Sequence, residues 1–129
     1  MDTPSDAELA LHGDLAAFER IVDGVLAELP EWVVERIDNL HVVVQDRPSP
    51  SQAEHGARLL GLYEGIMLKD RGMNYFAAAP DRISIFREEH LMMARTPERL
   101  AKQIRKTVLH EMAHHLGIDD DRLHELGWG

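Results

Sequence analysis

The sequence predicts an α+β fold in which N-terminal helices and a small mixed β-sheet of three to four strands pack on a long C-terminal helix. Three observations support this prediction. Apolar residues recur with helical spacing over residues 14–28 and again over residues 97–116. Short segments rich in β-branched residues lie between these two regions, as is typical of strands. The chain of 129 residues has the size of one ordinary domain, so residues 1–129 are expected to form a single domain.

Two helices are expected first. Asp14 is a suitable N-cap for a helix over residues 14–28, and Pro30 is expected at the first position of a short helix over residues 30–37. The apolar side chains of the first helix share one face because their spacing matches the helical repeat. These apolar residues are Leu15, Phe18, Ile21, Val22, Val25, Leu26 and Leu29.

Three strands are expected in the middle of the chain. Residues 40–45 are short and β-branched, and residues 59–65 form a second segment interrupted by glycines. In residues 82–87, isoleucine alternates with serine and phenylalanine, which predicts a strand with one exposed face. The connecting segments are expected to be a loop at residues 47–52 and a turn at residues 69–74.

The long C-terminal helix has recognisable ends. Thr96 is expected to cap it with Pro97 at its first position, and Gly117 is expected to end it in a left-handed conformation. One or two helical turns are expected before it, at residues 88–94, and a short acidic turn or helix after it, at residues 119–126. One face of the long helix carries an apolar residue at every fourth position: Leu100, Ile104, Val108, Met112 and Leu116.

The composition excludes several classes of protein. There are no cysteines, which excludes disulfide frameworks and thiolate metal sites. Lys and Arg number 14 against 23 Asp and Glu, a formal net charge of −9, so no nucleic-acid partner is expected. No apolar run approaches the roughly 20 residues that span a bilayer, and residues 1–14 lack the basic start of a signal peptide. We therefore expect no membrane partner and a cytoplasmic location.

The core must be mainly aliphatic. Aromatic residues make up only 5% of the chain, so they can fill little of the interior. Met92, Met93 and Met112 are expected to be core residues, because methionine adapts to irregular gaps between other apolar side chains.

Residues 110–114, His-Glu-Met-Ala-His, form the candidate site. On a helix, His110 and His114 lie one turn apart on one face, so both imidazoles can reach one zinc ion at about 2.0–2.1 Å. Glu111 lies about 100° around the helix from His110, on the flank of the metal side. Zinc lowers the pKa of a bound water to about 7, and Glu111 can take the proton of that water as general base. The motif therefore predicts Zn²⁺ as the cofactor.

A catalytic zinc ion normally has three protein ligands. Gly117 can turn the chain back so that Asp120, six residues after His114, faces the metal, and a carboxylate oxygen binds zinc at about 2.0–2.2 Å. Asp120 is therefore the expected third ligand. His115 follows a ligand directly and points elsewhere, so it is expected to have a structural role or to support a metal ligand. The alternatives to Asp120 as the third ligand are Asp119, Asp121, His124 and Glu125.

Residues 110–128, HEMAHHLGIDDDRLHELGW, resemble the signature H-E-x-x-H-x-x-G-x-x-D of the small bacterial zincin-like metallopeptidases, also called minimal zincins. Residues 59–90 are similar to the segment that precedes the active-site helix in this family. The resemblance implies a compact zincin-like core with an edge strand beside the cleft. It also implies zinc at His110, His114 and Asp120, with Glu111 as the catalytic base. Met67 departs from the proline expected after LYEGI.

The expected function is zinc-dependent hydrolysis of peptide bonds by a metal-activated water, with a peptide or protein substrate extended along the edge strand. Tyr63 and Tyr75 are candidates to stabilise the oxyanion, although a partly buried structural tyrosine is the simpler interpretation of each. Two alternatives remain: a metal-dependent endoribonuclease, and a zinc-binding interaction module without catalysis. The sequence leaves the oligomeric state open.

Overall fold

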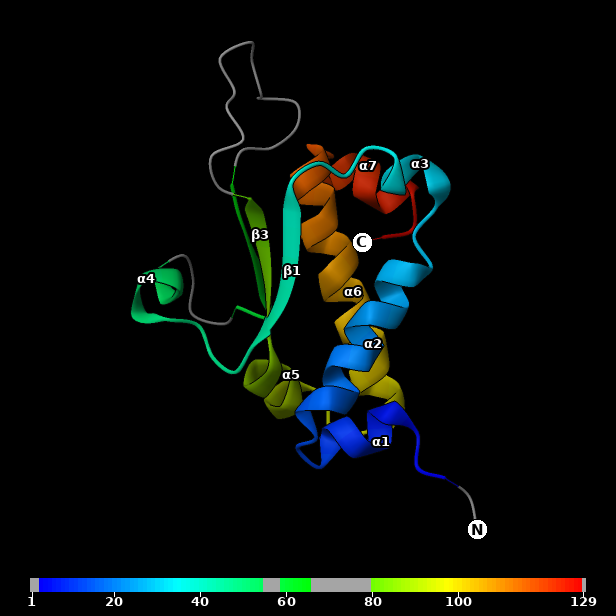
Figure 1. The fold of residues 1–129 in the computed structure, drawn as a ribbon, viewed down its shortest axis with the longest axis vertical. Helices are drawn as coiled ribbons and strands as arrows, with labels where there is room; N and C mark the ends of the chain where they lie inside the picture. The colour runs from blue at the N-terminus through cyan, green and yellow to red at the C-terminus, as the bar shows by residue number, and fades with distance from the viewer. Residues whose placement is uncertain (1–2, 55–58, 66–79, 129) are drawn as a thin grey trace.

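The computed structural model describes residues 3–54, 59–65 and 80–128, and its α+β architecture agrees with the sequence prediction (Figure 1). No helix within these ranges is long and apolar enough to cross a membrane. The helices and strands, in chain order, are α1 (Asp6–Leu11), α2 (Leu15–Ala27), α3 (Glu31–Val34), β1 (Leu40–Gln45), α4 (Pro50–Ala53), β2 (Gly61–Glu64), β3 (Asp81–Phe86), α5 (Arg87–Met93), α6 (Pro97–Leu116) and α7 (Asp120–Glu125).

The strands form a mixed sheet in the order β1-β3-β2. β1 runs parallel to β3, with Leu40 opposite Asp81, whereas β2 runs antiparallel to β3, with Gly61 opposite Ile85. β2 is therefore an edge strand of the sheet that the described residues form. This position matches the edge strand expected beside the cleft.

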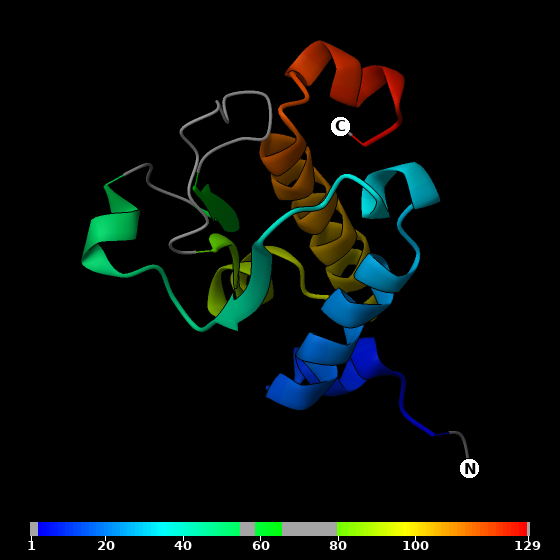
Figure 2. The same cartoon turned by 45° about the horizontal axis from the view of Figure 1, so that its top comes forward.

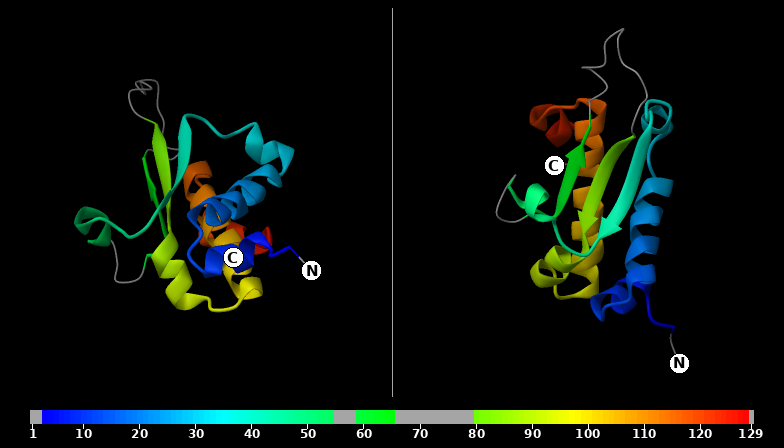
Figure 3. Two further views of the ribbon diagram at one scale, coloured as in Figure 1. Left: turned by 60° about the horizontal axis from the view of Figure 1, so that its bottom comes forward. Right: turned by 60° about the vertical axis from the view of Figure 1, so that its left-hand side comes forward.

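The helices cover both faces of the sheet. Figure 3 shows α2 and α6 on one side of the sheet and the short helix α4 on the other. The apolar face predicted for the C-terminal helix lies against this sheet and α2, and the core side chains Leu100, Ile104, Val108 and Met112 are fully buried. Burial of aliphatic side chains of this size contributes about 1.5–3 kcal/mol each, so this face fixes α6 on the sheet.

The ends of α2 and α6 follow from local sequence. The Asp14 carboxylate accepts a hydrogen bond from the backbone N–H of Ala17, and the Thr96 hydroxyl accepts one from Arg99. Gly117 ends α6 with φ 76°, a left-handed conformation that glycine adopts without steric cost. The predicted caps of both helices are confirmed.

Several local predictions were wrong. No helix was predicted in the acidic N-terminal segment, which forms α1 with Ser5 as its N-cap. Pro30 is the N-cap of α3 and not its first helical residue. The predicted loop at 47–52 overlaps α4, which begins at Pro50 because Ser49 and Gln52 form a reciprocal capping box. The turn predicted at 69–74 lies outside the described residues.

β3 is a central strand and has no wholly exposed face, contrary to the prediction. Ser84 and Phe86, on the face predicted to be exposed, are fully buried. Helix α4 covers this face, and the Gln52 amide donates hydrogen bonds to Glu64 on β2 at 2.9 Å and to Ser84 on β3 at 3.5 Å. A central strand that is covered on both faces buries the side chains on both of its faces.

Two of the three methionines assigned to the core are on the surface. Met112 is fully buried as predicted, but Met92 and Met93, at the C-terminal end of α5, are 59% and 65% exposed. Local composition does not reveal this difference, since it depends on where α5 ends relative to the sheet.

Candidate metal centre

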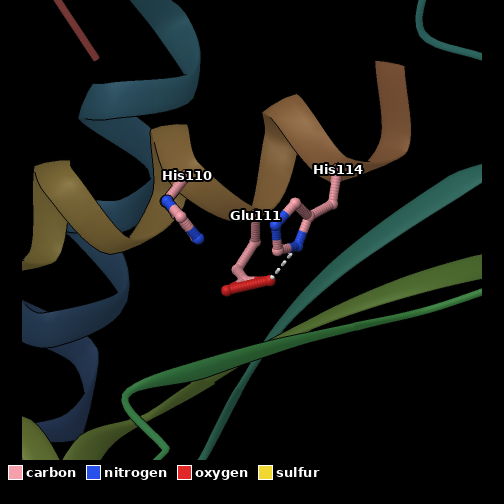
Figure 4. Close-up of side chains that lie close together, drawn as sticks. All are labelled: His110, Glu111 and His114. Atoms are coloured by element: carbon pink, nitrogen blue, oxygen red, sulfur yellow. Dashed lines mark hydrogen bonds and ion pairs between the residues drawn. The ribbon is translucent and has the colours of Figure 1, made fainter. Parts of the chain in front are cut away.

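One helix brings His110, Glu111 and His114 together, as predicted. They lie on α6, and a ligand atom from each of the three side chains lies within 4.8 Å of the others. The rings of His110 and His114 are 4.7 Å apart between centroids and inclined by 69°. Figure 4 shows the Glu111 carboxylate next to the two rings, on the side of α6 that faces the sheet. The one-turn separation of the histidines therefore produces a single cluster of nitrogen and oxygen donors.

Glu111 is held in place within this cluster. Its side chain is buried, at 7% exposure for the residue, and its Oε1 lies 3.0 Å from Nδ1 of His114. With a carboxylate as partner, the ring nitrogen is the donor, so Nδ1–H of His114 points at Glu111. The contact orients both a candidate ligand and the candidate base.

Edge strand β2 lies directly against this part of α6. A Cβ atom added to Gly61 would lie 2.7 Å from Cγ2 of Thr107 and 3.1 Å from Cγ of Glu111. Such distances mean that a side chain at this position does not fit unless the side chains of Thr107 and Glu111, the strand or the helix shift. The absence of a side chain at residue 61 therefore allows β2 to approach the residue that carries the candidate base.

Asp120, the expected third ligand, is the first residue of α7, which begins shortly after the left-handed Gly117. Its side chain lies outside what the structure describes. The Asp119 carboxylate caps α7 by accepting from the backbone N–H of Arg122, and Glu125 pairs with Arg122 at 2.9 Å. The remaining alternatives, Asp121 and His124, are exposed on α7.

A buried polar network next to the cluster was missed by sequence reasoning. His115 is fully buried, and its Nδ1–H donates to Oδ2 of Asp81 at 3.1 Å, while its Nε2 accepts from the backbone N–H of Asp38 at 3.3 Å. The hydroxyl of Tyr63 donates to the same Asp81 oxygen. The structural role expected for His115 is confirmed. Tyr75, the other oxyanion candidate, lies outside the described residues.

Asp81 therefore connects the edge strand β2, the central strand β3 and the helix α6. A single aspartate at the start of a strand carries no recognisable pattern, and its partners lie 18 and 34 residues away in sequence. No motif could have identified it. The hydroxyl of Tyr63, a candidate oxyanion donor in the sequence, is instead directed at this carboxylate.

The donor set fits a zinc ion. Zinc binds imidazole nitrogen, and His110 and His114 present two imidazoles one turn apart on a single helix, with the carboxylate of the candidate base beside them. His110 and His114 are partly exposed, while Glu111 is buried beside them. A groove of about 340 Å³ leads from the surface to His110 and Glu111. The donors are thus accessible from solvent.

These features define a class of protein: an α+β protein in which a helix carrying His-Glu-x-x-His lies beside an edge strand. The family model for zincin-like metallopeptidases matches residues 37–128, most of the chain. The chain therefore belongs to the zincin-like metallopeptidase family. No curated protein is significantly similar to it.

Proposed function

We propose that this protein is a zinc-dependent metallopeptidase that hydrolyses peptide bonds, with His110, His114 and Asp120 as zinc ligands and Glu111 as general base. The observation that carries the proposal is the position of Glu111, a buried residue that lines a groove and lies beside two imidazoles one helical turn apart. Zinc bound by these residues would supply a Lewis acid and lower the pKa of a water ligand to about 7.

Glu111 would move the protons of the reaction. Its carboxylate would accept a proton from the attacking water and deliver it to the nitrogen of the leaving amine. The N–H of His114 keeps one carboxylate oxygen oriented, so the second oxygen can serve as proton acceptor. Burial of Glu111 limits competing contacts with bulk solvent.

The substrate would lie extended along β2. An edge strand can pair with a peptide through backbone hydrogen bonds, which bind any sequence and orient the scissile carbonyl. Gly61 brings this strand close to Glu111. The Asp81 network, which joins Tyr63 on β2 to His115 on α6, would keep the distance between strand and helix constant.

The first prediction concerns Glu111→Gln. The amide keeps the size of the side chain but cannot accept the proton, so peptide hydrolysis should fall by about 100-fold or more, because general bases contribute roughly 10²–10⁴-fold. Zinc content should stay unchanged. The measurement is the digestion of a peptide library by both zinc-loaded proteins, followed by mass spectrometry.

The same two proteins separate the alternative functions. If both bind zinc and are equally inert toward peptides, the chain is a metal-binding interaction module and the peptidase proposal is wrong. Cleavage of structured RNA by the wild type, lost in Glu111→Gln, would instead identify an endoribonuclease. The net charge of −9 disfavours a polyanionic substrate.

A further inference from the structure

The groove that leads to Glu111 has a polar part and an apolar part. On the side of α6 it is lined by polar residues, among them His110 and Glu111. At its other end it is lined by Leu59 and Leu60, which precede β2, and by Met93 at the end of α5. The groove has a volume of about 340 Å³, so it is large enough to accept a side chain.

A second cavity lies next to the apolar end of this groove. It has a volume of about 310 Å³ and is lined by Leu60, Glu89, Met92 and Met93. Leu60 and Met93 line both cavities, so the two cavities adjoin at these side chains. Both lie between the start of β2 and the end of α5, and only the first of them also contains His110 and Glu111.

The exposure of Met92 and Met93 is consistent with a binding role. Both methionines belong to a short helix, and their side chains are 59% and 65% exposed. Single exposed apolar residues are common. Here Met93 lines the groove that contains the candidate catalytic base, and Met92 lines the cavity next to it, so the two methionines form a surface able to contact a ligand. Methionine is flexible and polarisable, so such a surface adapts to apolar side chains of different shapes.

Resting on the proposed function, we propose that this apolar end of the groove is the specificity subsite of the enzyme. It would receive a bulky apolar side chain, such as Leu, Met or Phe, from a residue adjoining the scissile bond. The subsite is continuous with the groove that contains His110 and Glu111. A residue seated there while the peptide backbone follows β2 would hold the neighbouring peptide bond beside Glu111.

The experiment compares paired peptides that differ only in Leu or Ala at the position flanking the cleaved bond. Wild-type protein loaded with zinc should cleave the Leu peptide with a kcat/KM about tenfold or more above that of the Ala peptide, since apolar pockets discriminate by roughly 10–200-fold per methylene. Met93→Ser should lower kcat/KM for the Leu peptide by about tenfold and leave kcat/KM for the Ala peptide nearly unchanged. Met93→Trp should fill the subsite and favour the Ala peptide.

Leu15→Ser is the matched control. Leu15 is 45% exposed at the start of α2 and lines neither cavity, so both peptides should be cleaved as by the wild type. Because Met93 is largely exposed, its variants should fold, which circular dichroism and zinc content can check. Cleavage without side-chain preference, or a preference that both Met93 variants retain, would overturn the subsite while leaving the peptidase proposal intact. A zinc-loaded wild type that cleaves neither these peptides nor the library would overturn both.

Discussion

His90 is fully buried, and it joins α5 to α6. Its Nδ1 lies 2.8 Å from the carbonyl oxygen of Phe86, and its Nε2 lies 2.9 Å from the hydroxyl oxygen of Thr107. The ring also packs edge-on against Phe18, with centroids 5.7 Å apart. Burial lowers the pKa of His90 below its usual value of 6.5, and hydrogen bonds to the carbonyls of Phe86 and Gln103 oppose this only in part. The folded protein therefore favours the neutral imidazole.

This pKa shift predicts a loss of stability in mild acid. The unfolded chain binds the proton near pH 6.5, whereas the folded chain binds it only at lower pH, so the unfolded state holds more protons between the two values. The contribution of neutral His90 to the free energy of unfolding is complete above pH 6.5. It decreases as the pH falls toward the pKa of His90 in the folded state, by at most about 1.4 kcal/mol per pH unit. Urea denaturation of metal-free protein between pH 7 and pH 5 measures this change in the free energy of unfolding.

The control for this prediction is His90→Gln, which has no titrating group at this position. Its free energy of unfolding should be lower at pH 7 because the contacts of the ring are lost, but it should change less between pH 7 and pH 5 than that of the wild type. If the free energy of unfolding changed equally with pH in the two proteins, His90 would be protonated with similar ease in the folded and unfolded states.

The approach of β2 to α6 is the contact between elements on which the candidate site most depends. Gly61 is in close proximity to Thr107 and Glu111 of the helix and to the carbonyl oxygen of Ser84 on β3. This arrangement places the edge strand directly over the candidate base. An increase in the separation of the two elements would change both the site and the packing of the sheet.

Gly61→Ala should therefore destabilise the protein by about 1–3 kcal/mol, as overpacking does, and should lower peptide cleavage. Gly24→Ala is the matched control: Gly24 is in α2, nothing lies within 4 Å of an added Cβ, and the substitution should stabilise the helix by about 0.5–1 kcal/mol. Chemical denaturation measures both effects. Equal effects of the two substitutions would contradict the close packing of β2 on α6.

The C-terminal segment is held by contacts with α3. The indole rings of Trp32 and Trp128 stack with centroids 6.2 Å apart, and the guanidinium of Arg36 lies 5.5 Å from the Trp32 ring. Leu123 of α7 is also buried in the core. Figure 2 shows α7 beyond the C-terminal end of α6, with α3 nearby. These contacts fix the helix that begins at Asp120.

At the scale of the whole molecule, the proposed zinc site would join α7 to α6. A ligand that binds only the folded state raises the free energy of unfolding, by about 2.7 kcal/mol at a free concentration of 100 Kd. Zinc should therefore raise the Tm of the wild type. Asp120→Ala should reduce this rise, because it removes one of the three proposed ligands.

Asp121→Ala is the matched control, since it removes the same charge from the next residue of the same helix. Differential scanning calorimetry with and without zinc compares the three proteins. A rise in Tm that is lost in Asp121→Ala and retained in Asp120→Ala would assign the third ligand to Asp121. A zinc effect unchanged in both variants would exclude the two residues as ligands.

The parts of the fold that were predicted depend on neighbours in sequence. Thr96 and Gly117 set the ends of α6 through contacts within a few residues. The His110, Glu111 and His114 cluster follows from the repeat of a single helix. The apolar face of α6 was likewise identified from its spacing. Local geometry is sufficient for such features, since residues three or four positions apart on a helix are neighbours in any fold.

Other features depended on contacts between distant segments. Asp81 meets Tyr63 and His115 only after β2, β3 and α6 have packed together. The burial of β3 on both faces and the exposure of Met93 depend on which elements cover them. The sequence by itself determined the helix that carries the candidate metal ligands, because its periodicity and caps are local. Only the tertiary structure decided what surrounds that helix, because residues far apart in the chain become neighbours through packing.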